Sequence, residues 1–234
     1  MVIKEQQGFF EKETQPGPLI KGVIFDLDGV IVDTAHYHYL AWKKLAAELG
    51  IDLTPEHNER LKGVSRLQSL DIILALGGIN HLSATEKEKL AHQKNTWFVD
   101  FIERMSPDEI FPGVKRLIET LRSRGVSVAL ASSSKNARTV LELLHISGLF
   151  DAVVDGTMVL NSKPDPEVFL LAASKLNLKP EECIVFEDAE AGVEAALRAG
   201  MKCVGIGDPA QLGKAHKVLP RTADFTVEMI NDLN

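Results

Sequence analysis

Alternating strand and helix signals run along most of this chain and predict an α/β protein with a Rossmann-like parallel sheet core. The series begins with the apolar run GVIFDLD and ends with KCVGIG. A second observation is that residues 35–103 carry helical patterns but no strand signal of comparable strength. We therefore expect an all-helical cap domain inserted after the first strand. The expected boundaries are 1–19 for an N-terminal extension, 20–34 and 104–234 for the core domain, and 35–103 for the cap domain.

Turn and cap residues separate the expected elements. The first strand runs into Asp28-Gly29, a dipeptide typical of a loop. Gly50 and Gly125 are stop signals for two helices with apolar stripes. The expected elements are, in order, strand 22–28, helices 36–49, 67–76 and 85–105, a helix that Pro112-Gly113 opens, strand 126–131, helices 135–146 and 166–176, strand 183–187, helix 190–199 and strand 202–207.

Composition excludes several classes of protein. Of 234 residues, 45% are hydrophobic and 25% charged, which is ordinary for a globular chain. The net charge of −7 disfavours nucleic acid and anionic membranes as partners. The two cysteines, Cys183 and Cys203, are too few for a disulfide scaffold and lie in apolar runs, so buried reduced thiols are expected. The sequence shows neither a secretory signal nor an apolar run of about 18 residues, so we expect a cytoplasmic protein.

Four carboxylates follow two of the expected strands. Asp26 and Asp28 lie at the end of the first strand, and Glu187 and Asp188 lie at the end of the strand at 183–187. In parallel sheets, ligands bind beyond the carboxyl ends of the strands. Each acidic pair alone is typical of a turn or a helix cap, but four carboxylates in one cleft repel one another strongly. Mg²⁺ relieves such repulsion and leaves room for a substrate phosphate, so the set predicts a magnesium site.

Hydroxyl and cationic groups are expected at the same edge. Ser132, Ser133 and Ser134 follow the strand at 126–131 and lead into a helix, where hydroxyl and backbone N–H groups bind anions. Lys163 precedes the helix at 166–176 and adds positive potential. Carboxylates, Mg²⁺, a lysine and a hydroxyl loop together indicate phosphoryl transfer to an aspartate.

Four sequence motifs resemble those of a known superfamily. FDLDGVIVDT, ALASSSKN, KPDPEVF and VFEDAEAGVEAALRAGM are similar, in this order, to the motifs of the haloacid dehalogenase-like (HAD) superfamily across residues 20–210. Within it, DTAHYHYLAWKKLAAELGI and LKGVSR resemble the β-phosphoglucomutase subgroup. The N-terminal extension and three consecutive serines in the second motif depart from the pattern, but neither changes a catalytic residue type.

The resemblance assigns roles to the core residues. Asp26 is expected to be the nucleophile, since a carboxylate is ionised at neutral pH and needs no base. Asp28 is expected to be the general acid–base. Ser132 and Lys163 would hold the transferring phosphoryl group. The implied ligands of one Mg²⁺ ion are Asp26, Asp28 through its backbone carbonyl, Glu187 and Asp188.

The resemblance also implies a substrate site shared by the two domains. Arg66 suits a bidentate grip on the phosphate that is not being transferred. Thr34 is expected to be a hinge residue, His36 a surface residue and Trp42 part of the cap core. The expected substrate-binding residues are His38, Lys62, Gly63, Val64, Arg66, Ser134, Lys135 and Asn136, with His38 coupling cap closure to Asp28.

The implied activity is an isomerase reaction. The enzyme would interconvert β-D-glucose 1-phosphate and glucose 6-phosphate through an aspartyl phosphate, with glucose 1,6-bisphosphate as intermediate and activator. A Mg²⁺-dependent sugar-phosphate phosphatase is the alternative, and other hexose or disaccharide phosphates stay open as substrates. A non-catalytic binding protein would not need Asp26, Asp28, Lys163 and Asp188 together. A dehalogenase would need only the first aspartate and would leave the phosphate loop and the metal residues unexplained. We expect a monomer whose partner is a small sugar phosphate, not nucleic acid or membrane.

Overall fold

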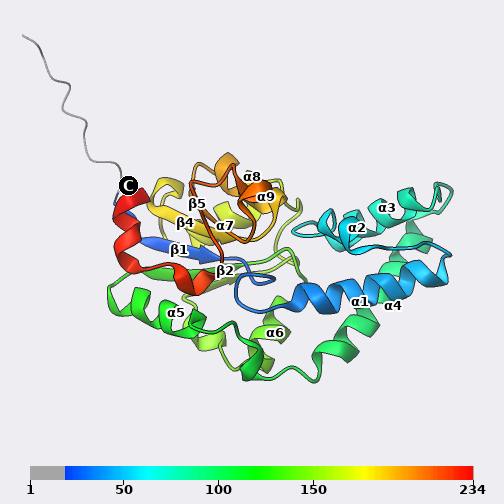
Figure 1. Ribbon diagram of the computed structural model, residues 1–234, viewed down its shortest axis with the longest axis horizontal. Helices are drawn as coiled ribbons and strands as arrows, with labels where there is room; N and C mark the ends of the chain where they lie inside the picture. Colours follow the sequence, from blue (N-terminus) through cyan, green and yellow to red (C-terminus); the bar gives the residue numbers. More distant parts are fainter. Residues whose placement is uncertain (1–18, 234) are drawn as a thin grey trace, which may run out of the picture.

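A central sheet flanked by helices forms the core domain, and a separate group of helices lies at one end of it (Figure 1). The computed structural model describes residues 19–233, so the expected extension at 1–19 lies, except for Leu19, outside the described residues. Within the described range, six parallel strands form one sheet in the order β3-β2-β1-β4-β5-β6. This arrangement confirms the predicted fold class.

The elements have the following bounds. The strands are β1 (Gly22–Phe25), β2 (Ser127–Ala131), β3 (Ala152–Val154), β4 (Cys183–Glu187), β5 (Lys202–Ile206) and β6 (Lys217–Leu219). The α-helices are α1 (Thr34–Glu48), α2 (Pro55–Glu59), α3 (Arg66–Leu76), α4 (Ala84–Ile102), α5 (Val114–Ser123), α6 (Ala137–Leu143), α7 (Glu167–Lys175), α8 (Glu190–Arg198) and α9 (Pro209–Leu212). Short 3-10 helices span Pro107–Glu109, Ser147–Leu149, Pro180–Glu182, Thr222–Asp224 and Val227–Leu233.

Both faces of the sheet are covered. Alternate residues of β1 point to opposite sides, because successive side chains of a strand alternate. Val23 and Phe25 belong to one apolar cluster with residues of α5 and α6, and Ile24 belongs to another with residues of α7 and α8. All three side chains are fully buried. Burial on two faces explains why the strand reads as a continuous apolar run.

The cap consists of α1 to α4, at the right of Figure 1, and has its own apolar core. Trp42 and Leu45 from α1 pack there with Leu70 from α3 and Ala91 from α4. Trp42 is therefore in the cap core, as predicted. Leu40 of the same helix is 36% exposed and lies outside this core.

Two chain segments connect the cap to the core, and they contact each other. Phe111 N donates to Ile31 O at 2.9 Å, and Val32 and Ile110 form an antiparallel bridge. Tyr37, early in α1, donates its hydroxyl to Glu109 Oε2 at 2.7 Å. Both connections are thus pinned together beside the sheet.

The expected elements are present, and the structure contains several shorter elements that the sequence did not predict. Strand β1 ends three residues before the predicted 28, because the chain turns out of the sheet into a loop after Asp26. Helix α6 is shorter than the predicted 135–146, since residues 135–136 form a turn and His145 has a positive φ of 54°. The edge strands β3 and β6 have three residues each, and α2 and α9 are single turns. Such short segments carry too few residues for a periodic signal.

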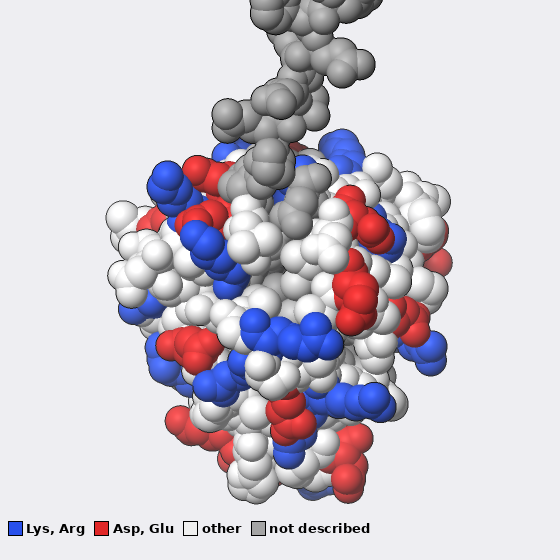
Figure 2. All heavy atoms as spheres, turned by 90° about the vertical axis from the view of Figure 1, so that its left-hand side faces the viewer, with Lys and Arg blue, Asp and Glu red and all other residues white. Residues whose placement is uncertain are grey.

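The described surface and interior agree with an ordinary globular chain. Cys183 and Cys203 are free and buried, as predicted. Figure 2 shows the face on the side away from the cap, where basic and acidic residues are interspersed. Among residues 19–233, none of the helices combines the length and apolar character needed to cross a bilayer.

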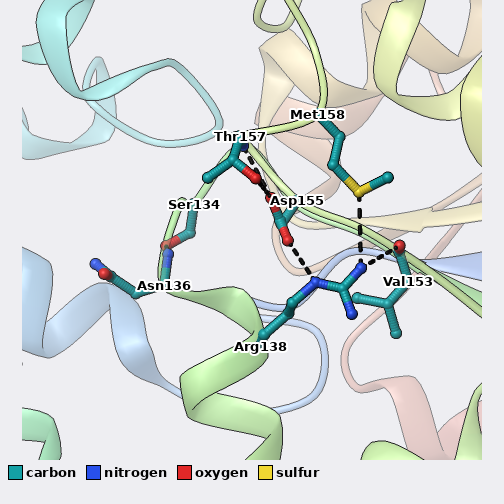
Figure 3. Close-up of polar contacts among 7 residues, drawn as sticks. All are labelled: Ser134, Asn136, Arg138, Val153, Asp155, Thr157 and Met158. Carbon is teal, nitrogen blue, oxygen red and sulfur yellow. Dashed lines mark hydrogen bonds and ion pairs between the residues drawn. The ribbon is translucent and has the colours of Figure 1, made fainter.

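A buried carboxylate braces the two loops at the ends of β2 and β3 (Figure 3). Asp155 Oδ2 accepts Arg138 Nε at 2.8 Å, and Asp155 Oδ1 accepts Thr157 N at 2.8 Å. Arg138 Nη2 also donates to Val153 O at 3.1 Å. Gly156 N donates to the Ser134 carbonyl at 3.1 Å. The network around Asp155 therefore supports the serine loop, residues 132–134, which follows β2.

We expect Asp155→Ala to lower the free energy of unfolding by about 1–3 kcal/mol, because it leaves the Thr157 amide without its acceptor. The exposed Arg138 side chain contributes little of this loss, since solvent screens its ion pair. Denaturant unfolding measures the change, with Glu119→Ala on the exposed face of α5 as control. Equal values for the two variants would show that Asp155 does not brace the loops.

Candidate active site

The first acidic loop leaves the sheet directly after β1. Asp26 is still joined to β4, since its N–H donates to Phe186 O at 2.9 Å. Gly29 then turns the chain with φ +74°, and a Cβ there would lie 2.1 Å from an Asp188 carboxylate oxygen. Only glycine permits this approach, which brings the carboxylates after β1 and β4 together.

Lys163 is a fully buried cation between two carboxylates. Its Nζ donates to Asp26 Oδ1 at 2.8 Å and to Glu187 Oε2 at 2.7 Å. Burial alone would lower the pKa of Lys163, but the charges of Asp26 and Glu187 outweigh it and raise this pKa above the ordinary range. Lys163 therefore stays protonated and compensates part of the negative charge.

Three carboxylates form a group suited to a cation. Asp26, Glu187 and Asp188 each offer an oxygen, and these oxygens lie within 4.8 Å of one another. Burial, with the charge of neighbouring carboxylates, raises the pKa of Asp28, Glu187 and Asp188 to about 8 despite Lys163. One lysine therefore does not balance the group. A divalent cation with oxygen ligands would do so, and the residues present fit Mg²⁺.

Gly192 of α8 holds Glu187 in this group. A Cβ at Gly192 would lie 2.0 Å from the Glu187 carboxyl carbon. Ala189 N donates to Glu187 Oε1 at 3.2 Å. The start of α8 thus packs directly on the carboxylate and directs its other oxygen to Lys163.

A cavity of about 500 Å³ lies between the acidic loops and the cap. Its volume is within the range of small-molecule sites. The predicted site residues that line it come from both domains and are Asp26, Asp28, His38, Lys62, Gly63, Val64, Arg66, Ser134, Lys135, Lys163 and Asp188.

Other predicted site residues lie near the cavity but not on its wall. Ser132 is buried, and its Oγ accepts Ser134 N at 3.1 Å. Asn136 Nδ2 donates to Asn95 Oδ1 of the cap at 2.8 Å, and its side chain points away from Arg138 in Figure 3. Glu187 lies behind Lys163. Thr34 begins α1, and His36 is exposed, as expected.

Asp28 has an atom free for proton transfer. Among the described residues, Asp28 Oδ1 and Thr34 Oγ1 are buried side-chain atoms without a hydrogen-bond partner. An unpartnered buried carboxylate oxygen is costly unless a ligand or proton completes it. Since Asp28 lines the cavity, a substrate oxygen can reach it there.

Lys94 is a site residue that the sequence analysis missed. It is only 1% exposed, lines the cavity from α4 and lies 2.6 Å from His38 Nδ1. Its Nζ is over the rings of Trp42 and Phe98, and the His38 ring stacks on Phe98. Burial, with the charge of Arg66, holds the pKa of Lys94 well below its usual range. The short contact leaves this pair with at most one positive charge.

A sequence signal for Lys94 did exist. Ala91, Lys94, Phe98 and Ile102 share the buried face of α4 at helical spacing. A lysine at such a position is unusual, because buried lysines need a partner. The periodicity of residues 85–105 could therefore have placed Lys94 on the buried face, but only the fold shows that its partner is His38.

The fold and the acidic loops agree with one family of proteins. The sequence profile of the haloacid dehalogenase-like hydrolases matches residues 20–200. This range covers most of the chain and includes the four motifs except for Met201, the last residue of the fourth. The chain belongs to the haloacid dehalogenase-like hydrolase family.

Similar proteins include mutases and phosphatases. The chain is 44% identical to a β-phosphoglucomutase of Bacillus subtilis (strain 168) over 91% of its length and 95% of the relative. It is 33% identical to a phosphorylated carbohydrates phosphatase of Thermotoga maritima, over 84% of this chain and 89% of the relative. The crystal structure of a β-phosphoglucomutase from Clostridium difficile matches with a TM-score of 0.88 and 44% identity, over 92% of this chain and 96% of that one.

The Lys94–His38 contact has a consequence for titration. Burial, followed by the charges of Lys94 and Arg66, holds the pKa of His38 well below its usual range. Lys94→Met removes one charge but keeps the packing on Trp42. We expect the pKa of His38 to rise in this variant yet stay below the ordinary value, because burial remains.

NMR titration of the His38 ring measures this change. The control is Lys44→Met, which removes a cation from the face of Trp97 rather than from His38. An unchanged His38 midpoint in Lys94→Met would contradict the contact.

Proposed function

We propose that this protein is a phosphomutase that interconverts β-D-glucose 1-phosphate and glucose 6-phosphate through glucose 1,6-bisphosphate. The main support for this proposal is that cationic side chains suited to binding phosphate line one cavity from both domains. The reacting groups Asp26 and Asp28 lie on its core side, and Arg66 lies on its cap side. A mutase needs both, because its intermediate has two phosphates. The similarity to β-phosphoglucomutases supports this assignment.

Asp26 is the proposed nucleophile. Lys163 holds one of its oxygens at 2.8 Å and thereby orients the carboxylate. A bond forms between an Asp26 oxygen and phosphorus while the bond from phosphorus to the donor oxygen breaks. Lys163 also offers positive charge to the transferring group, and Ser132 is proposed to donate its hydroxyl to it.

Asp28 is the proposed proton carrier. Its unpartnered Oδ1 gives a proton to the departing sugar oxygen and later accepts one from the attacking hydroxyl. We propose that His38 and Lys94 connect this step to the cap, because these two cap residues lie 2.6 Å apart and line the same cavity as Asp28. Thr34, at the start of α1, is the proposed hinge. The proposed cap boundaries remain 35–103.

The remaining residues bind substrate. Arg66 and Lys62 of the cap and Lys135 of the serine loop offer charge to the distal phosphate. Gly63 and Val64 offer backbone groups to the sugar. Ser134 and Asn136 complete the proposed set. Asn136 reaches the ligand only if its amide turns from Asn95 or shares its second proton.

Mg²⁺ is the proposed metal, and Asp26, the Asp28 carbonyl, Glu187 and Asp188 are its proposed ligands. When bound, it neutralises the carboxylates and the phosphoryl oxygens. The chain's contribution is the placement of the oxygens of Asp26, Glu187 and Asp188 within 4.8 Å of one another at the carboxyl ends of β1 and β4. We propose that the enzyme acts as a cytoplasmic monomer.

A phosphatase is the second candidate, favoured by the similarity to the Thermotoga maritima carbohydrate phosphatase. Water would then replace the sugar hydroxyl as phosphoryl acceptor. The deciding experiment incubates the protein with α- and β-glucose 1-phosphate, Mg²⁺ and a trace of glucose 1,6-bisphosphate. Glucose 6-phosphate from the β anomer supports the mutase. Stoichiometric free phosphate instead supports the phosphatase.

Asp26→Asn should abolish phosphorylation of the protein by labelled acetyl phosphate while the fold persists. The amide oxygen can still accept from Lys163, but it cannot attack phosphorus. Protein-bound label and circular dichroism are measured together, with the exposed Asp52→Asn as control. Label retained on the Asp26→Asn variant would show that another residue is the nucleophile.

Mg²⁺ should raise the midpoint of thermal unfolding, because it binds a carboxylate group that exists only in the folded chain. Excess chelator should reverse this rise and abolish turnover. Asp188→Asn should lose most of the rise, whereas Asp208→Asn, the same change at an exposed helix cap, should keep it. An equal rise in both variants would exclude Asp188 from the metal site.

Arg66→Ala should lower mutase activity by about tenfold to a hundredfold, because it removes charge-assisted hydrogen bonds to the distal phosphate. Phosphorylation of Asp26 by acetyl phosphate should change much less, since that donor has no second phosphate. Arg60→Ala is the control, an exposed arginine of the same domain that does not line the cavity. Equal losses with both donors would favour the phosphatase.

A further inference from the structure

Neutral hydrogen bonds join the cap to the core around the cavity. In each, the core donor belongs to a loop at the carboxyl edge of the sheet. They are Ser133 Oγ to Gly63 O at 2.9 Å, Asn136 Nδ2 to Asn95 Oδ1 at 2.8 Å, and Ser162 Oγ to Gln68 Oε1 at 2.6 Å. The bond from Ser162 to Gln68 is the shortest of the three. Both residues form further hydrogen bonds, Gln68 to Ser65 and Ser162 to Asp165.

Gln68 organises the start of α3. Its Oε1 accepts Ser65 N at 3.1 Å, and Gln68 N donates to Ser65 Oγ at 3.3 Å, which completes a capping box. Arg66 is the first residue of this helix. The backbone that carries Arg66 is therefore held by Gln68 on one side.

Ser162 stands at the other end of the same contact. It lines the cavity and directly precedes Lys163. Its carbonyl accepts Asp165 N at 3.0 Å, so the segment is a turn. One amide oxygen thus connects the helix start that carries Arg66 with the turn that carries Lys163, while Gln68 itself is not among the residues that line the cavity.

We propose that Gln68 is a positioning residue: its bond to Ser162 holds the cap closed and sets Arg66 relative to Lys163. The inference rests on the proposed function, since a grip on the distal phosphate is useful only at a fixed distance from the reacting group. Gln68 acts through these two residues and does not touch the substrate.

The same domain contains a matched control. At the start of α4, Ser83 and Glu86 form a second capping box, with Glu86 Oε2 accepting Ser83 N at 2.8 Å. Within the described residues, the hydrogen bonds of Glu86 stay inside that helix start. Glu86→Ala therefore removes a capping box without removing a contact between domains.

The first test measures the distance between the domains in the free protein. Spin labels are attached at Asp52→Cys in the cap and Glu142→Cys in the core, two exposed positions, while Cys183 and Cys203 are buried. In pulsed electron–electron double resonance, Gln68→Ala and Ser162→Ala should shift the distances away from those of the parent. Glu86→Ala should match the parent.

The second test is kinetic. Loss of one neutral hydrogen bond that favours closure should raise KM for β-glucose 1-phosphate about three- to tenfold. The double variant Gln68→Ala/Ser162→Ala should be no worse than the more affected single variant, because both remove one interaction. Ser162→Thr keeps a hydroxyl and should restore the parent KM more fully than Ser162→Ala.

Two outcomes would overturn the proposal: unchanged distances in both Gln68→Ala and Ser162→Ala, or an equal shift in Glu86→Ala. If the parent protein forms no glucose 6-phosphate, the proposed function fails, but the distance measurement still decides whether Gln68 holds the cap closed.

Discussion

The buried ammonium of Lys163 is the interaction on which the site depends. It contacts the carboxylate that follows β1 and the carboxylate of the last residue of β4, the two central strands, and so fixes the end of the sheet where the acidic loops gather. Removing one partner from a buried ion pair costs about 3–5 kcal/mol, because the other charge stays uncompensated. Even with Lys163 present, burial and the neighbouring carboxylates raise the pKa of Asp28 and Asp188 to about 8, and a bound cation would relieve this cost of ionisation.

Charge is distributed unequally between the two domains. The core holds the buried ions of the acidic loops, whereas the hydrogen bonds that join cap and core around the cavity, such as Ser162 to Gln68, are neutral, and the cap cation Lys62 comes only to 4.0 Å from Asp188. A neutral hydrogen bond contributes about 0.5–1.5 kcal/mol net, so a few of them favour closure without making it permanent. An enzyme that exchanges substrate through this cavity needs such a balance. The ionic part of the site therefore stays assembled while the neutral part can break.

The sequence predicted the parts of the site that lie at the ends of fully buried apolar strands. Asp26 and Glu187 were found because β1 and β4 are buried on both faces and read clearly. The edge strands β3 and β6 were missed because three residues show no period. Lys94 and Gln68 act through partners 56 and 94 residues away, and only folding brings such pairs together. The short-range capping pattern at Ser65 was present, but it does not indicate a second use of Gln68.

The paired connections between cap and core also determine how the cap can move. Tyr37 bonds to Glu109, and Phe111 bonds to Ile31. The two segments that connect the cap to the core are therefore held together as one double-stranded connection. A domain on a single flexible tether samples many orientations and loses that freedom each time it docks. A domain held by two hydrogen-bonded connections has fewer orientations to lose, so closure of the cap on the core costs little conformational entropy. The weak hydrogen bonds between cap and core around the cavity are then sufficient to keep the cavity closed.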